Sequence, residues 1–193
     1  MRAARSFLAT ALALAVLAAG CGNARQHAPD PARTQKPAAA KRVTFAAVGV
    51  SFAAPRNWLQ GGGAKPLVAL FGSGSSAVAV WRYPRKEPIP TGRSELQLVQ
   101  ANLSDAIQAR DRSAHIEHTG IVDVHGLKGI QVVALERVNG QSRRVRSTHL
   151  FAHGTELVID AFAPPGDFAQ VDRTVFAPLI DSLRWRPPAT RGR

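Results

Sequence analysis

The sequence predicts an α+β fold in which an antiparallel sheet of about seven or eight strands carries helices packed on it. Strand-like runs occur in two sets of four, and each set is followed by a stretch with the apolar period of an amphipathic helix. The strands of the second set are joined by short turns containing glycine, which favours antiparallel neighbours because parallel strands need long connections. The two helices are expected to pack on this sheet and cover it.

The first set of strands surrounds a glycine-containing loop. Apolar side chains alternate with small or polar ones over Val48–Phe52, and Val43–Phe45 is a candidate partner strand. A loop is expected through residues 57–63. Leu67–Phe71 and Ala77–Tyr83 then indicate a hairpin around the glycines and serines of residues 72–75.

The first helix is predicted from about Ser94 to Arg110. Its apolar residues recur at helical spacing, and Ser94 with Gln97 forms a possible capping box. The apolar side of this helix consists of Leu96, Val99, Leu103, Ala106 and Ile107.

Four strands follow, and their turns are the clearest signals in the chain. Asn139-Gly140 is the strongest of these, because a type I′ turn needs two residues that tolerate positive φ. The other two joints, at His125-Gly126 and His153-Gly154, are expected to need only the freedom of glycine. The predicted strands are His115–Val124, Leu127–Val138, Gln141–Ala152 and Thr155–Ala163.

The closing helix is predicted after Asp167, which is the expected cap with Gln170 as its partner. It extends to about Leu183. Pro178 lies inside it, where it removes one helical hydrogen bond and clashes one turn back. A kink or split is therefore expected near Arg173 to Phe176.

The first residues have the features of an export signal. Arg2 and Arg5 precede an apolar stretch, Phe7–Ala19, which is too short to cross a bilayer. Small residues then lead to Cys21, the single cysteine of the chain. The run from Leu17 to Cys21 resembles the lipobox of bacterial lipoproteins, although its aliphatic residue lies one place further from the cysteine than is commonest. An ordinary secretory signal with an incidental cysteine is the alternative.

The lipobox resemblance implies a diacylglyceryl thioether on Cys21 and cleavage before it. The mature protein would then be exported and anchored to the outer face of a bacterial membrane. We expect a signal peptide at 1–20, the lipidated cysteine with a flexible linker at 21–42, one domain at 43–185 and a basic disordered tail at 186–193.

The formal net charge of +12 does not indicate nucleic-acid binding, because the excess lies largely in the two tails. Seven basic residues precede Val43 against a single acid, Asp30, and the last ten residues contain four arginines and no acid. Basic residues that flank a lipid anchor are attracted to an anionic membrane surface. Nucleic acid is therefore excluded as a partner.

Three segments resemble the PsbP-like and Mog-like superfamily, which includes LpqN-type actinobacterial lipoproteins. They are Gly49–Trp58, the turn with Val124, Gly126 and Gly129, and the closing helix with Phe176, Ile180, Ser182 and Leu183. The resemblance implies a three-layer α/β/α fold. Members act mainly as binding or assembly partners: one type supports the oxygen-evolving side of photosystem II, and another binds a small GTPase. No functional residue is transferred, because the matching positions are core and turn residues.

Arg143, Arg144 and Arg146 are candidates for a basic binding surface. An acidic partner or a lipid headgroup would suit such a surface. The simpler interpretation is a solvated strand in which Glu136 pairs across the hairpin with Arg143, and this interpretation is favoured.

Ser147, His149 and Asp160 are expected to be neighbours, because the turn at His153-Gly154 places Ser147 opposite Asp160. A serine in the middle of a strand lacks the exposed turn and the oxyanion donors that nucleophilic catalysis requires. Polar side chains on one sheet face are the favoured interpretation. No catalytic residue is therefore assigned.

No cofactor or metal site is assigned either. The histidines at 115, 118, 125, 149 and 153 lie on strands and turns without cysteine support, unlike zinc ligands at tight spacing. Trp58, Trp81 and Trp185 are assigned to the core by default, although a pocket lined by such rings is the alternative.

The predicted function is that of a non-enzymatic binding or assembly module for an unknown envelope protein. The alternative is a carrier or sensor that holds a lipid or small apolar ligand between sheet and helix. A deep apolar pocket would favour the carrier, and an exposed apolar patch would favour the protein partner.

Overall fold

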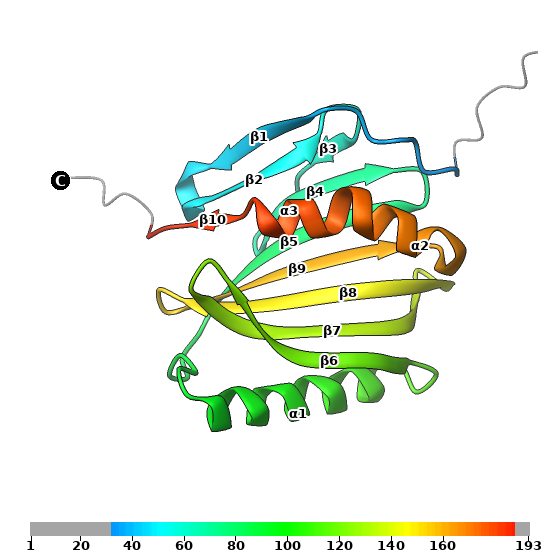
Figure 1. Cartoon of the computed structure of the whole chain (residues 1–193). Helices are drawn as coiled ribbons and strands as arrows, with labels where there is room; N and C mark the ends of the chain where they lie inside the picture. Colours follow the sequence, from blue (N-terminus) through cyan, green and yellow to red (C-terminus); the bar gives the residue numbers. More distant parts are fainter. Residues whose placement is uncertain (1–31, 188–193) are drawn as a thin grey trace, which may run out of the picture.

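The computed structural model describes residues 32–187 and contains two antiparallel sheets (Figure 1). The smaller sheet has the order β1 (Ala40–Phe45), β2 (Val50–Pro55) and β10 (Arg184–Trp185). The larger sheet has seven strands in the order β3 (Leu59–Gly61), β4 (Leu67–Ser73), β5 (Ser76–Pro84), β9 (Thr155–Ala163), β8 (Gln141–Ala152), β7 (Leu127–Val138) and β6 (His115–Val124). No helix in the described part of the chain is long and apolar enough to cross a membrane.

The α+β prediction is confirmed, and the four strands β6 to β9 have the predicted bounds. Two details of the first strand set differ. β1 and β2 pair with each other as expected but belong to the separate smaller sheet, which β10 completes. The expected loop at 57–63 contains β3, a three-residue edge strand, because its backbone pairs with Leu70–Gly72 of β4.

The three turns of the second strand set are alike. His125, Asn139 and His153 have φ of 56°, 51° and 52°, and the glycine after each also has positive φ. All three turns thus place two successive residues in the left-handed region, as type I′ hairpins do. The expectation that two of them need only the freedom of glycine is wrong, since each histidine shares the strained conformation.

The closed face of the large sheet, defined by Val80, Leu150 and Ile159, holds the main core. The smaller sheet and the closing helical segment cover it, and Phe52, Phe71 and Leu179 are almost completely buried there. Gly129 allows β7 to approach β8 closely, because a Cβ at this position would lie 2.0 Å from the carbonyl oxygen of His149.

The open face, defined by Trp81, Ser147 and Val158, is only partly covered. Helix α1 (Arg93–Arg110) packs mainly on β6 and β7, and Figure 1 shows it along that edge of the sheet. Leu96 and Ile107 of α1 form a second core cluster with Ile130, Val132 and other residues of β7 and β8. The order of layers is therefore helix, sheet, and then helix with the smaller sheet.

The start of α1 differs from the predicted capping box. Gly92 is the N-cap, and the Glu95 carboxylate accepts hydrogen bonds from the amides of Thr91 (2.7 Å) and Gly92 (3.0 Å). These two donors hold the pKa of Glu95 below its usual value. Ser94 and Gln97 take no part in these bonds.

The closing helix is split where Pro178 predicted a break. It comprises α2 (Pro165–Val171), a π-helical turn (Asp172–Phe176) and α3 (Ala177–Asp181). Proline has no amide to donate, and the wider turn before it accommodates the missing bond. Asp167 lies inside the first turn and Pro164 is the N-cap, so the predicted cap is wrong.

Residues 32–39 were expected to belong to the flexible linker, but residues 32–35 lie against the β4–β5 turn and residues 36–39 contact Arg56 and Asn57. The Gln35 amide donates to Ser73 Oγ (3.0 Å), the Ser75 amide donates to the Ala32 carbonyl (2.9 Å), and Thr34 Oγ1 lies 2.6 Å from Ser76 Oγ. The described structure also begins its first strand at Ala40, before the expected boundary at 43.

Candidate functional site

A groove lies between α1 and the uncovered half of the open face. Its volume is about 590 Å³. One wall is the side of α1 that carries Leu103, Ala106, Ile107 and Arg110. The floor is formed by open-face residues of β5, β8 and β9, namely Ala79, Trp81, Tyr83, Val145, Ser147, His149, Glu156, Val158, Asp160 and Phe162. The groove exists because α1 covers only the last two strands of the sheet.

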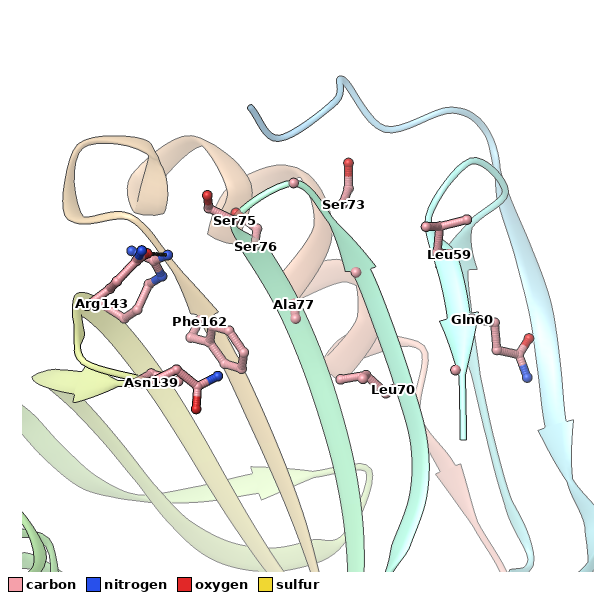
Figure 2. A pocket seen from close by; sticks show the side chains of 15 residues that line it. Leu59, Gln60, Leu70, Ser73, Ser75, Ser76, Ala77, Asn139, Arg143 and Phe162 are labelled. Atoms are coloured by element: carbon pink, nitrogen blue, oxygen red, sulfur yellow. Dashed lines mark hydrogen bonds between the residues drawn. The ribbon is translucent and has the colours of Figure 1, made fainter. Parts of the chain in front are cut away.

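The groove continues into a second hollow of about 600 Å³ at the end of the sheet. Val138, Asn139 and Phe162 line both spaces. Figure 2 shows Asn139 and Arg143 on one side of this hollow, Phe162 and Ala77 in its middle, and Leu70 and Leu59 towards its far side. Leu59 is 81% exposed and Leu70 is 36% exposed, so apolar surface is open to solvent here.

Five polar side chains form a hydrogen-bonded chain, and all of them except Arg85 line the groove floor. Ser147 Oγ donates to Asp160 Oδ1 (2.6 Å) and lies 2.9 Å from Nε2 of His149. Nδ1 of the same imidazole lies 2.6 Å from Glu156 Oε1. Arg85 completes the chain, because its Nη1 donates to the other oxygen of Glu156 at 3.0 Å.

The predicted proximity of Ser147, His149 and Asp160 is therefore confirmed. Glu156 and Arg85 were missed, although the same register contains the signal for Glu156. His149 is paired with Val158, so Glu156 is its diagonal neighbour on the same face of β9. Arg85 lies directly after β5, outside the strand register, so nothing in the sequence indicated that it contacts Glu156.

The direction of the Ser147 hydrogen bond differs from that in a catalytic triad. Ser147 has a single hydroxyl proton, and it is donated to Asp160 Oδ1. In a catalytic triad the corresponding proton is directed at the imidazole, which accepts it as the general base. The Ser147 proton in this cluster is directed away from His149.

The backbone around Ser147 also differs from that of a catalytic serine. Ser147 lies in the middle of β8, paired with Val132 of β7 and Asp160 of β9, and is only 8% exposed. Its amide belongs to the sheet and is not free to bind an oxyanion. This mid-strand position differs from the exposed turn on which an activated serine is presented.

The carboxylates of the groove floor act on their neighbours. Burial favours a higher pKa for Glu156, but the hydrogen bond and charge of His149 and the charge of Arg85 bring that pKa below its usual 4.5. Burial raises the pKa of the Tyr83 hydroxyl, and the nearby charges of Asp160 and Glu156 raise it further. Tyr83 therefore lies within the electrostatic reach of both carboxylates.

The three arginines proposed as a basic surface do not lie together. Arg143 faces the hollow at the end of the sheet, whereas Arg144 binds Glu117 (2.7 Å) and Arg146 binds Asp172 (2.6 Å). The expected Glu136–Arg143 pair is wrong. Glu136 is opposite Arg143 but pairs with Arg110 of α1 at 2.5 Å.

The remaining tryptophans and histidines that the sequence offered as candidates mostly pack in the core or form contacts between segments. Trp58 and Trp185 are buried in the main core, whereas Trp81 lines the groove. His125 Nε2 contacts the carbonyl of Asp181 at 2.6 Å, and His153 packs edge-on against Trp185. Among residues 32–187, no three histidine, cysteine or acidic side chains are placed to hold a metal ion. Cys21 lies outside the described residues.

The two antiparallel sheets and their helices form an α+β fold, which comparison with solved structures identifies as PsbP-like. The structure is similar to the solution structure of cyanobacterial PsbP (CyanoP) from Synechocystis sp. PCC 6803, with 13% identity and a TM-score of 0.58, covering 78% of this chain and 95% of that one. It is also similar to LpqN, involved in cell envelope biogenesis of Mycobacterium tuberculosis, with 11% identity and a TM-score of 0.53, covering 77% and 91%. No family model and no curated protein sequence matches the chain.

Proposed function

We propose that the chain is an exported lipoprotein, anchored through Cys21, whose PsbP-like domain is a non-enzymatic binding module. The groove between α1 and the sheet is its binding surface. One observation supports this role above the others: α1 leaves half of the open face uncovered, and the uncovered half carries aromatic side chains beside a polar chain. The leader sequence and the cysteine that follows it support export and anchoring.

The geometry favours a small ligand or carried molecule over an interface for a protein partner. A space of about 590 Å³ in which polar side chains converge beside apolar and aromatic ones is within the size range of small-molecule sites. A protein partner is the second candidate, and the exposure of Leu59 and Leu70 at the adjoining hollow favours it.

A groove-filling substitution tests the proposed function. Ala106 is an exposed α1 residue that lines the groove, so Ala106→Trp fills the space without removing a core side chain. Native mass spectrometry of the chain isolated from its own host should show a bound small molecule, and this species should be absent from the variant.

Leu98→Trp is the matched control, because Leu98 is 64% exposed on α1 and is not part of the groove lining. The control should retain the ligand. A wild-type protein without any bound molecule, recovered instead with a stoichiometric envelope protein that Ala106→Trp still binds, would contradict the ligand groove and favour the second candidate.

A further inference from the structure

We infer that the groove binds an organic cation, with its ammonium group beside Asp160 and its apolar body over the rings of the groove floor. This inference rests on the proposed function of the groove as a binding site. It names the charge and the chemical class of the ligand.

Asp160 differs from the other two carboxylates that line the groove. Glu136 is paired with Arg110, and Glu156 is paired with Arg85 and His149. Within residues 32–187, Asp160 forms no ion pair, and its hydrogen bond comes from the neutral hydroxyl of Ser147. A partly buried carboxylate without a cation favours a ligand that supplies one.

Aromatic side chains surround this carboxylate on the open face. Phe162 lies two residues further along β9, and Trp81 is opposite Val158, which makes it a diagonal neighbour of Asp160. Tyr83 follows on the same face of β5. The faces of aromatic rings attract cations, most strongly for tryptophan.

No protein cation uses these rings. In the described part of the chain, the arginine–ring contacts are those of Arg85 with Phe151 and Arg144 with Phe168, both away from the rings near Asp160. The raised pKa of Tyr83 supports the same conclusion, since after burial its causes are the charges of Asp160 and Glu156. A cation bound beside Asp160 would offset the negative charge that acts on Tyr83.

Three probes with a common ring and different charges test the inference. The purified full-length chain is titrated with 2-phenylethylammonium, neutral 2-phenylethanol and anionic 3-phenylpropionate, and the indole N–H signal of Trp81 is followed by NMR. Trp81→Phe assigns that signal. The cation should bind roughly tenfold more tightly than the alcohol, about the effect of 1.4 kcal/mol, and the anion should bind more weakly than both.

Asp160→Asn removes the charge and keeps an oxygen that can accept from Ser147. In this variant the cation and the alcohol should bind with equal affinity. Asp181→Asn is the matched control, because Asp181 is exposed at the end of α3, which packs on the smaller sheet. The control should keep the full preference for the cation.

The possible outcomes distinguish a cationic ligand from a groove that binds small molecules without regard to charge. Equal binding of cation and alcohol to the wild type would overturn the cationic ligand and leave the groove as a binding site. A preference that survives in Asp160→Asn would overturn the role of Asp160. Binding of none of the probes would contradict both the cationic ligand and a small-molecule groove.

Discussion

The hydroxyl of Ser147 lies between Asp160 and His149, and the direction of its proton decides what these side chains can do. Ser147 donates its proton to Asp160, so the cluster has the residue types of a catalytic triad without the serine proton directed at His149. Residue identity and spacing alone do not give the direction of the serine proton, because that direction depends on the 2.6 Å hydrogen bond from Ser147 Oγ to Asp160 Oδ1. The cluster therefore fixes the shape and charge of the groove floor.

The lowered pKa of Glu156 predicts a specific loss of stability in acid. A carboxylate whose pKa is lower in the folded than in the unfolded state stabilises the fold above its unfolded value and loses that contribution as pH falls through its folded value. Glu156→Gln lacks this contribution. The free energy of unfolding in urea should thus fall less for Glu156→Gln than for the wild type between about pH 6 and about pH 3.

Asp105→Asn is the control for this measurement, because Asp105 is an exposed carboxylate on α1. Its unfolding free energy should follow that of the wild type over the same range. Parallel pH profiles for Glu156→Gln and the wild type would contradict the stabilising role of the ionised Glu156.

At the scale of elements, a side-chain hydrogen bond adds to the apolar packing between the closing helix and the smaller sheet. Ser182 Oγ accepts the amide of Ala53 in β2 (2.8 Å) and donates to the carbonyl of Leu179 (2.9 Å). This contact joins segments 129 positions apart in the sequence. In the sequence, Ser182 is distinguished only by its place in the superfamily resemblance. Its contact with Ala53 is visible only in the tertiary structure.

Ser182→Ala should therefore destabilise the fold by about 1–2 kcal/mol, because the Ala53 amide loses its acceptor. Chemical denaturation measures this change. Ser104→Ala is the matched control, since Ser104 Oγ donates only to the carbonyl one turn back in α1 (3.0 Å). An equal effect of both substitutions would show that the contact between helix and sheet contributes nothing of its own.

At the scale of the whole molecule, the position of the N-terminal segment sets where the groove lies relative to an anchor. Residues 32–35 are bound at the β4–β5 turn, and Ser73, Gly74, Ser75 and Ser76 of that turn also line the hollow that continues the groove. Eleven positions separate Cys21 from Ala32. Even fully extended, that length spans about 40 Å, so an anchored domain would keep the groove near the membrane.

Cys21→Ser tests the anchor. The wild type should partition into the detergent phase and the membrane fraction, whereas the variant should be recovered in the aqueous phase, because two acyl chains provide the stable attachment. Thr10→Ser, a conservative change in the same leader, should not alter the partition. A Cys21→Ser protein that stays in the membrane fraction would contradict lipid anchoring.

The sequence by itself determined the features that depend on local periodicity and turn chemistry. These are the bounds of β6 to β9, the extent of α1 and the break before Pro178, because alternation, helical spacing and a missing amide act over a few residues. It also predicted the proximity of Ser147, His149 and Asp160, which follows from the register of one two-residue turn.

Only the tertiary structure decided how far α1 covers the sheet, which carboxylates obtain cations and where residues 32–39 lie. Each of these features depends on contacts between distant segments, such as Arg110 with Glu136 and Thr34 with Ser76. Local sequence patterns carry no information about the energies of such contacts. The groove exists for the same reason. It is the space left when one helix covers two strands of a seven-stranded sheet.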